Sequence, residues 1–387
     1  MSSSAVADRV GFDVERVLGR VRGERAGPSL VVVGGLHGNE PAGVLALKRV
    51  LADLSGRADR VRGELVALSG NRRALRVGRR FLVRDLNRAW SPKRIAYLRA
   101  ADATLEAGED QEQAELLTEM ERAFADARGP VHVLDLHTTS GAGAPFSTAC
   151  DTLRNRRFAL EVPAPFVLGL EERVEGTLMD WVDGLGHTVM VFESGQNQDP
   201  AAVDRAEGAV WLALVAAGVI EEADAPEATR ARTALRAERG DIPRVLEFRY
   251  RHPVTPAAQF KMLPGFKSFQ RVRKGQVLAQ DIQGDVTAPA TARILMPLYQ
   301  EQGEDGFFIV REFRFVWLKV SEVLRRLHAD RIAHWLPGIR RVAGYDDRLL
   351  VNRRVARWYA LELLHLLGYR RERESGAALL VQRRPGE

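Results

Sequence analysis

The sequence has one cysteine and no long apolar run, and each absence excludes a class of protein. Cys150 has no second cysteine to pair with, so a disulfide scaffold is excluded, and a reducing, cytoplasmic setting is expected. We interpret Cys150 as a small, unreactive core side chain. No stretch of about 18 apolar residues is present, which argues against a membrane span. The N-terminal stretch MSSSAVADRVGFDVE lacks the apolar segment of a secretory signal.

An excess of charge of one sign is also missing from most of the chain. The 57 Lys and Arg residues and the 51 Asp and Glu residues give a net charge of +6. Residues 313–387 hold 16 basic and 8 acidic residues, a net charge of +8, so the remaining residues carry −2. The basic character therefore says little about the partners of the main body of the chain.

Three regions of different character follow one another along the chain. Residues 1–225 alternate apolar runs with amphipathic segments, which predicts an α/β domain with helices on both faces of its sheet. Residues 221–241 are polar and predict a linker whose second half can be helical. Residues 242–312 are rich in Gly and Pro and predict a small β-rich domain. Residues 313–387 predict a basic, mainly helical accessory domain of unknown role that ends in a hairpin.

The predicted elements have these bounds. In the first region, strands are expected at 29–36, 63–71, 131–137 and 187–195, and helices at 41–54, 114–127 and 205–220. In the last region, helices are expected at about 316–334 and 350–367.

The heptapeptide GLHGNEP (35–41) places two metal-capable side chains where the first predicted strand ends. His37 and Glu40 stand three residues apart, so both can reach one ion from a turn. Such a pair is common on helix surfaces, but this one follows a buried strand, and α/β sheets bind ligands at the carboxyl ends of their strands. Gly35 and Gly38 give the backbone room to turn.

A third ligand is expected at the end of another strand. In VLDLH, side-chain alternation places Asp135 and His137 on one face and His132 on the other. His137 can complete a His–Glu–His set with an open position, which is the ligand pattern of catalytic zinc. Asp135 can hold a ligating imidazole in place.

Two further segments supply groups that hydrolysis needs. Glu193 ends an apolar strand in VMVFESG, where a carboxylate is costly unless it is used or paired. It can take the proton of a water whose pKa zinc lowers to about 7. The segment GRRFLVRDLNRAW adds Arg80, Arg84, Asn87 and Arg88. Guanidinium groups bind carboxylates and stabilise oxyanions, although an ion-paired glutamate and a solvated basic loop are the alternative interpretations.

In this order, the motifs resemble the succinylglutamate desuccinylase/aspartoacylase family of the zinc carboxypeptidase superfamily. The similarity covers about residues 15–220, with a weaker match at 296–308. The matching motifs are GGLHGNEPAG (34–43), GNRRAL (70–75), RRFLVRDLNR (79–88), DLHTTSG (135–141) and FESGQ (192–196). The resemblance implies a mixed β-sheet with helices on both faces, followed by a β-rich domain.

The resemblance also implies a chemistry. It implies one zinc ion per chain and hydrolysis of the amide bond of an N-acyl amino acid or a similar small carboxylate-bearing amide. Arg84 departs from the family pattern, and residues 313–387 have no counterpart in it. The implied site consists of His37, Glu40 and His137 on zinc, Glu193 as general base and acid, Arg80 beside the oxyanion, Asn87 and Arg88 on a substrate carboxylate, and Tyr299 reaching in from the β-rich region.

Two other functions share parts of this pattern. A zinc carboxypeptidase acting on a peptide or a peptidoglycan fragment would use the same metal site. A catalytically idle regulatory protein would bind nucleic acid through the basic segment 313–387, whose helix–helix–hairpin order resembles a winged helix. The complete set of metal ligands together with Glu193 favours an enzyme. An oligomer is compatible with the sequence, which specifies neither the acyl group nor the amino acid.

Overall fold

The computed structural model describes residues 13–100, 108–352, 355, 360–375 and 378–384. Within these residues the strands form sheets of 11, 3 and 4 strands. The largest sheet has the order β1 (Val17–Arg22), β3 (Arg62–Ser69), β2 (Arg25–Gly34), β4 (Val131–Thr139), β7 (Thr188–Gln196), β5 (Phe146–Ala149), β6 (Phe166–Leu168), β8 (Val245–Pro253), β14 (Asp305–Glu312), β13 (Ala292–Leu295) and β10 (Arg271–Val272).

The centre of this sheet is parallel and its edges are antiparallel. Strands β3, β2, β4 and β7 run parallel to one another, whereas β1 and β5 run antiparallel to their neighbours β3 and β7. The sheet is therefore mixed. Since helices cover both of its faces, the predicted fold class is confirmed.

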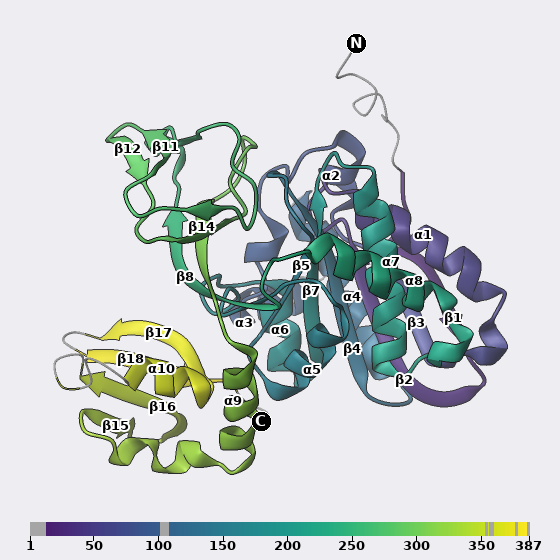
Figure 1. The fold of residues 1–387 in the computed structure, drawn as a ribbon. Helices are drawn as coiled ribbons and strands as arrows, with labels where there is room; N and C mark the ends of the chain where they lie inside the picture. The colour runs from purple at the N-terminus through teal and green to yellow at the C-terminus, as the bar shows by residue number, and fades with distance from the viewer. Residues whose placement is uncertain (1–12, 101–107, 353–354, 356–359, 376–377, 385–387) are drawn as a thin grey trace.

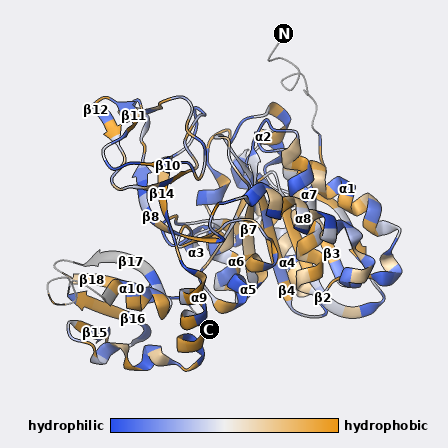
Figure 2. Ribbon diagram, in the orientation of Figure 1, coloured by the Kyte–Doolittle hydropathy of each residue, from blue (hydrophilic) through white to orange (hydrophobic). Residues whose placement is uncertain are grey.

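Helices cover the sheet because its central strands are apolar on both faces. Leu30–Val33 of β2 are completely buried, and Figure 2 shows hydrophobic residues concentrated in the central strands. The first helices are α1 (Ala42–Ser55), α2 (Arg72–Val77), α3 (Pro92–Ala100), α4 (Glu109–Ala125), α5 (Leu153–Glu161), α6 (Leu178–Gly184) and α7 (Ala201–Ala217). Helices α1 and α7 pack against each other and contact β2 and β4, while α4 packs against β2 and β3 (Figure 1).

Residues 221–241 are not a free linker. They contain α8 (Pro226–Arg239), which packs along α7. The buried side chains of α8 are Ala228, Ala231 and Leu235, spaced three and four residues apart. A Cβ on Gly208 of α7 would lie 2.8 Å from Ala231, so small residues allow close helix contact. The stripe of buried alanines is only weakly hydrophobic, so the sequence of this charged segment does not predict a packed helix.

The β-rich region is joined to the large sheet. Strand β8 pairs parallel with β6, and β14, β13 and β10 continue the same sheet outward. Three shorter strands, β9 (Lys261–Met262), β11 (Val277–Asp281) and β12 (Gly284–Thr287), form a small sheet of their own (Figure 1). The region therefore begins as an extension of the large sheet.

The C-terminal unit, defined here as residues 313–384, contains more strand than the sequence predicts. Its helices are α9 (Phe315–Arg326) and α10 (Ala360–Leu366). Its four-stranded antiparallel sheet has the order β15 (Ile339–Val342), β16 (Tyr345–Asn352), β18 (Ala378–Arg383) and β17 (Tyr369–Ser375). The final hairpin is confirmed, but residues 350–352 of the predicted second helix belong to β16. Strand and buried helix are hard to tell apart in short apolar runs such as LLVN.

Short 3₁₀ turns complete the described structure. They cover Ala58–Arg60, Leu86–Arg88, Glu222–Asp224, Pro256–Ala258 and Ala329–Trp335. Among the described helices, none combines the length and the apolar character that crossing a bilayer requires.

Candidate metal centre

Three neighbouring parallel strands end at the same edge of the sheet and bring the candidate residues together. His37 and Glu40 lie in the turn between β2 and α1. His137 lies near the end of β4, and Glu193 lies directly opposite it in β7. Gly35 turns the chain after β2 with a φ of +73°, a conformation that other residues rarely adopt.

His37, Glu40 and His137 form a compact, buried cluster. One ligand atom from each lies within 4.8 Å of the others. Glu40 Oε1 is 2.9 Å from His37 Nδ1, and Glu40 Oε2 is 3.0 Å from His137 Nδ1. The three side chains are at most 4% exposed, so water contributes little to their solvation.

The far nitrogens of both imidazoles face carboxylates. His37 Nε2 lies 3.1 Å from Asp85, and His137 Nε2 lies 2.9 Å from Asp135. An ionised carboxylate only accepts hydrogen bonds, so each ring proton belongs on Nε2. Each Nδ1 then directs a lone pair at Glu40. Two imidazole nitrogens and a carboxylate that face one another could hold a metal cation, and this donor set fits zinc.

Asp135 occupies the position that strand alternation predicts. Asp85 has a role that the sequence did not reveal, because the loop that carries it reaches His37 only in the folded chain. The available signal was its place beside Arg80, Asn87 and Arg88 in a single motif.

The charges of the cluster shift the pKa of both glutamates. Burial acts to raise the pKa of Glu40, but the two imidazoles outweigh it and hold that pKa well below its ordinary value. Burial raises the pKa of Glu193 to about 8, with Glu40 adding to the rise and His137 opposing it. Glu193 Oε2 is buried and has no hydrogen-bond partner among the described residues. This carboxyl group is therefore available to a water or a substrate.

A small cavity of about 80 Å³ opens beside the cluster. Arg80, Asn87, Arg88 and Glu193 all line it. Arg80 lies 3.4 Å from Glu40 and 3.0 Å from Asp85. The structure thus brings these predicted residues into one site.

Two arginines of the same loop have other partners. Arg88 pairs with Asp305 of β14 at 3.0 Å, which ties the loop to the β-rich region. Arg84 pairs with Asp110 at 2.9 Å, is half exposed and does not line the cavity. The charge at Arg84, which departs from the family pattern, therefore does not form part of the cavity wall.

The structure does not bring Tyr299 into this cavity. Its hydroxyl group donates to the carbonyl of Leu263 at 2.7 Å and accepts from the Phe266 N–H at 2.9 Å. These contacts hold it on the surface of the β-rich region, with 39% of the residue exposed. Met296, Asp305 and Phe308 are the residues of that region that line the cavity.

His132 and Cys150, for which the sequence predicts no part in the metal site, lie away from the cluster. His132 faces the other side of β4 and packs on Phe158, with 5.1 Å between the ring centroids. Cys150 is a free, buried thiol whose pKa burial raises well above its ordinary value. A buried thiol in its neutral form is a poor nucleophile.

Residues 26–200, which contain the whole cluster, match the succinylglutamate desuccinylase/aspartoacylase catalytic domain. Over this stretch the chain is similar to the catalytic domain of that family. It is 30% identical over 151 residues to a succinylglutamate desuccinylase from Photorhabdus laumondii. That alignment covers 38% of this chain and 44% of the relative, so the chain spans less than half the length of the curated relative it matches.

Solved structures of other proteins have a similar fold. A succinylglutamate desuccinylase/aspartoacylase from Rhodobacter sphaeroides superposes with a TM-score of 0.56 at 19% identity, covering 77% of this chain and 88% of that one. An ectoine utilization protein from Ruegeria pomeroyi gives a TM-score of 0.55 at 19% identity, covering 75% and 87%. At this identity the likeness establishes the fold alone.

Proposed function

We propose that this protein is a zinc-dependent deacylase that hydrolyses the amide bond of an N-acyl amino acid or a similar small carboxylate-bearing amide. The observation that carries the proposal is the buried His37–Glu40–His137 cluster beside Glu193, which lines the same cavity wall and whose Oε2 has no hydrogen-bond partner among the described residues. One zinc ion per chain would be held by the three clustered side chains. The match of residues 26–200 to the succinylglutamate desuccinylase/aspartoacylase catalytic domain supports the same chemistry.

The residues divide the work of hydrolysis as follows. When bound, zinc would act as a Lewis acid on the scissile carbonyl and would make water more acidic. Glu193 takes a proton from the attacking water and returns it to the departing nitrogen. Arg80, already positively charged beside Glu40 and Asp85, stabilises the oxygen that becomes negative. Asn87 and Arg88 orient the substrate carboxylate.

The substitution Glu193→Gln tests the proposal. It keeps the shape of the side chain and removes the proton acceptor, so kcat should fall by about 100-fold or more. Elemental analysis should still find about one zinc per chain, because the substitution leaves the three ligands in place. Hydrolysis of N-acyl amino acids at the original rate by this variant would contradict the assigned role.

A comparison of substrates distinguishes the proposed deacylase from the alternative carboxypeptidase. N-acyl amino acids and short peptides with a free C-terminus are offered to the zinc-loaded protein, and the released amine is measured. The proposal expects turnover of the N-acyl amino acids. Turnover of peptides alone would replace it with the carboxypeptidase assignment.

A further inference from the structure

A second and much larger cavity lies beside the metal site, at the junction with the C-terminal unit. Its volume is about 560 Å³, whereas the cavity at the metal cluster measures about 80 Å³. Ligand pockets are usually about 300–1,000 Å³, so the small cavity alone has little room for a whole N-acyl amino acid. Glu171 and Val174 line both cavities. The two spaces therefore share a wall.

Glu171 lies in this shared wall, and its carboxyl group accepts no hydrogen bond from the described residues. Its side chain is only 8% exposed. Burial raises its pKa to about 7, Arg384 opposes the rise, and Glu172 and Asp180 add to it. A carboxyl group that lines a cavity and accepts no hydrogen bond among the described residues is available to a ligand.

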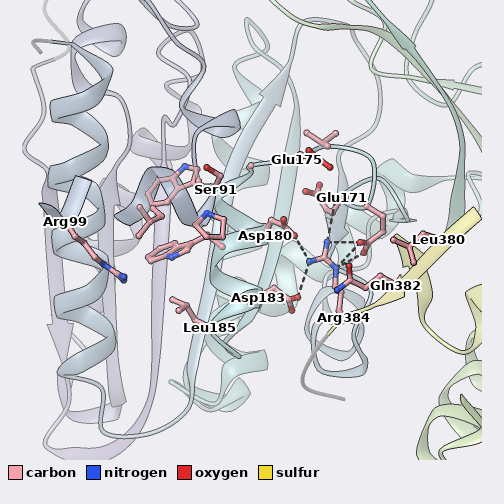
Figure 3. Close-up of a pocket in the computed structure, with 18 residues that line it drawn as sticks. Ser91, Arg99, Glu171, Glu175, Asp180, Asp183, Leu185, Leu380, Gln382 and Arg384 are labelled. Carbon is pink, nitrogen blue, oxygen red and sulfur yellow. Dashed lines mark hydrogen bonds and ion pairs between the residues drawn. The ribbon is translucent and has the colours of Figure 1, made fainter. Parts of the chain in front are cut away.

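The larger cavity has an excess of acidic groups. Its wall contains five carboxyl groups and two guanidinium groups. Arg384 is already paired with Glu172 at 2.9 Å, with Asp180 at 2.6 Å and with Asp183 at 3.2 Å. Figure 3 draws the pairs with Asp180 and Asp183 as dashed lines. Arg99 is paired with Glu121 at 2.5 Å. Arg384 and Arg88 act on the Glu171 carboxyl group through space, but neither donates a hydrogen bond to it among the described residues. Because carboxyl groups still outnumber guanidinium groups in this wall, the cavity favours a positively charged guest.

The C-terminal unit closes this cavity. Leu380, Gln382 and Arg384 come from or directly follow β18 and face α6 and the Glu171–Glu175 loop (Figure 3). The apolar part of the wall includes Trp181, whose indole stacks on Trp90 at 5.0 Å between ring centroids. Indole rings pack well against alkyl chains and cationic groups.

We propose that the two cavities form one elongated substrate site, which binds the scissile amide beside the metal ligands and an ammonium or guanidinium group of the same substrate in the larger cavity, next to Glu171. The preferred substrates are then N-acylated basic amino acids or N-acyl diamines. This inference rests on the proposed deacylase function, and it assigns the C-terminal unit a role as the outer wall of the substrate site.

The test compares substrates that differ only in charge. The zinc-loaded, full-length protein is assayed with Nα-acetyllysine, its neutral analogue Nα-acetylnorleucine and the acidic N-acetylaspartate. We expect the highest kcat/KM with acetyllysine. In Glu171→Gln, the ratio of kcat/KM for acetyllysine over acetylnorleucine should fall by about 10- to 100-fold, the usual effect of losing a charge-assisted hydrogen bond. The control Glu161→Gln changes an exposed carboxylate that lines neither cavity.

A second variant tests the cavity itself. Leu380→Trp places a large ring in the proposed site and should lower kcat/KM for acetyllysine. Leu327→Trp makes the same change at a residue that is 73% exposed and does not line the cavity, and it should leave kcat/KM unchanged. Equal values for both variants and the original protein would overturn the inference.

A binding measurement separates the inference from the proposed function. Calorimetry with lysine amide detects the cation site without turnover, and binding should weaken in Glu171→Gln. Binding that depends on Glu171, without hydrolysis of any N-acyl amino acid, would overturn the deacylase function and support the cation site. Hydrolysis with no preference for the cationic substrate and no effect of Glu171→Gln would overturn the cation site and support the deacylase function.

Discussion

At the scale of single residues, the candidate metal centre depends on partners that fix the two imidazoles. Asp85 and Asp135 each face the nitrogen that points away from Glu40. Such carboxylates select the ring tautomer and make the opposite nitrogen a better ligand. Asp85 also binds Arg80 at 3.0 Å, so one carboxylate orients both a predicted ligand and the predicted oxyanion partner.

Removing this partner should weaken metal binding. We expect Asp85→Ala to lower zinc affinity by about 10- to 100-fold, because His37 loses its orienting acceptor. Competition with a chelator measures the affinity. Asp110→Ala is the matched control, since Asp110 pairs with Arg84 of the same loop and lies outside the cavity. Equal zinc affinity in the Asp85 variant and the original protein would rule out this orienting role.

At the scale of elements, the turn between β2 and α1 has to pass very close to α2. A Cβ added to Gly38 would lie 2.0 Å from the carbonyl carbon of Ala74, a distance that only backbone movement can relieve. The Gly38 N–H also donates to the carbonyl of Arg80 at 3.0 Å. This turn therefore holds the metal ligands and the Arg80 loop in one arrangement.

Gly38→Ala should disrupt that arrangement. We expect a loss of stability of about 1–3 kcal/mol, as overpacking usually produces, together with weaker zinc binding because His37 and Glu40 move with the turn. Chemical denaturation and metal analysis measure the two effects. Gly56→Ala is the control: its φ is −73° and the nearest atom to its added Cβ is 3.7 Å away. A Gly38 variant as stable and as zinc-loaded as the control would show that the turn tolerates a side chain.

At the scale of the whole molecule, buried arginines attach the C-terminal unit to the catalytic region. Asp151 forms ion pairs with Arg325 and Arg370 of the C-terminal unit and with Arg156 of α5. Arg384 makes a second buried attachment through Glu172, Asp180 and Asp183. Part of the +8 charge of the C-terminal segment is thus neutralised inside the protein and is not presented to a nucleic acid.

Asp151→Ala should loosen this attachment. It leaves three guanidinium groups without their shared carboxylate, and breaking a buried ion pair in this way usually costs about 3–5 kcal/mol. We expect a lower free energy of unfolding and faster proteolytic removal of the C-terminal unit. Glu322→Gln breaks a 3.6 Å pair with Arg157 at the exposed edge of the same contact, and its effect should stay below about 1 kcal/mol. Similar stability and protease resistance in both variants would contradict the attachment role of Asp151.

The sequence by itself determined an α/β sheet and the polar side chains at the ends of its strands, while the mixed character of the sheet followed from the family resemblance. Apolar runs that end at or just before His37, His137 and Glu193 mark the strands, because strand periodicity is a local signal. The alternation of strands with helices then favours a parallel order in which the strand ends share one edge. Only the tertiary structure placed Asp85 beside His37, left Tyr299 outside the cavity and attached α8 to α7. The second cavity also exists only in the folded chain, because residues that line it, such as Arg384 and Glu172, lie 212 residues apart in the sequence. Contacts between such distant side chains depend on how whole elements pack, which no local pattern in the sequence records.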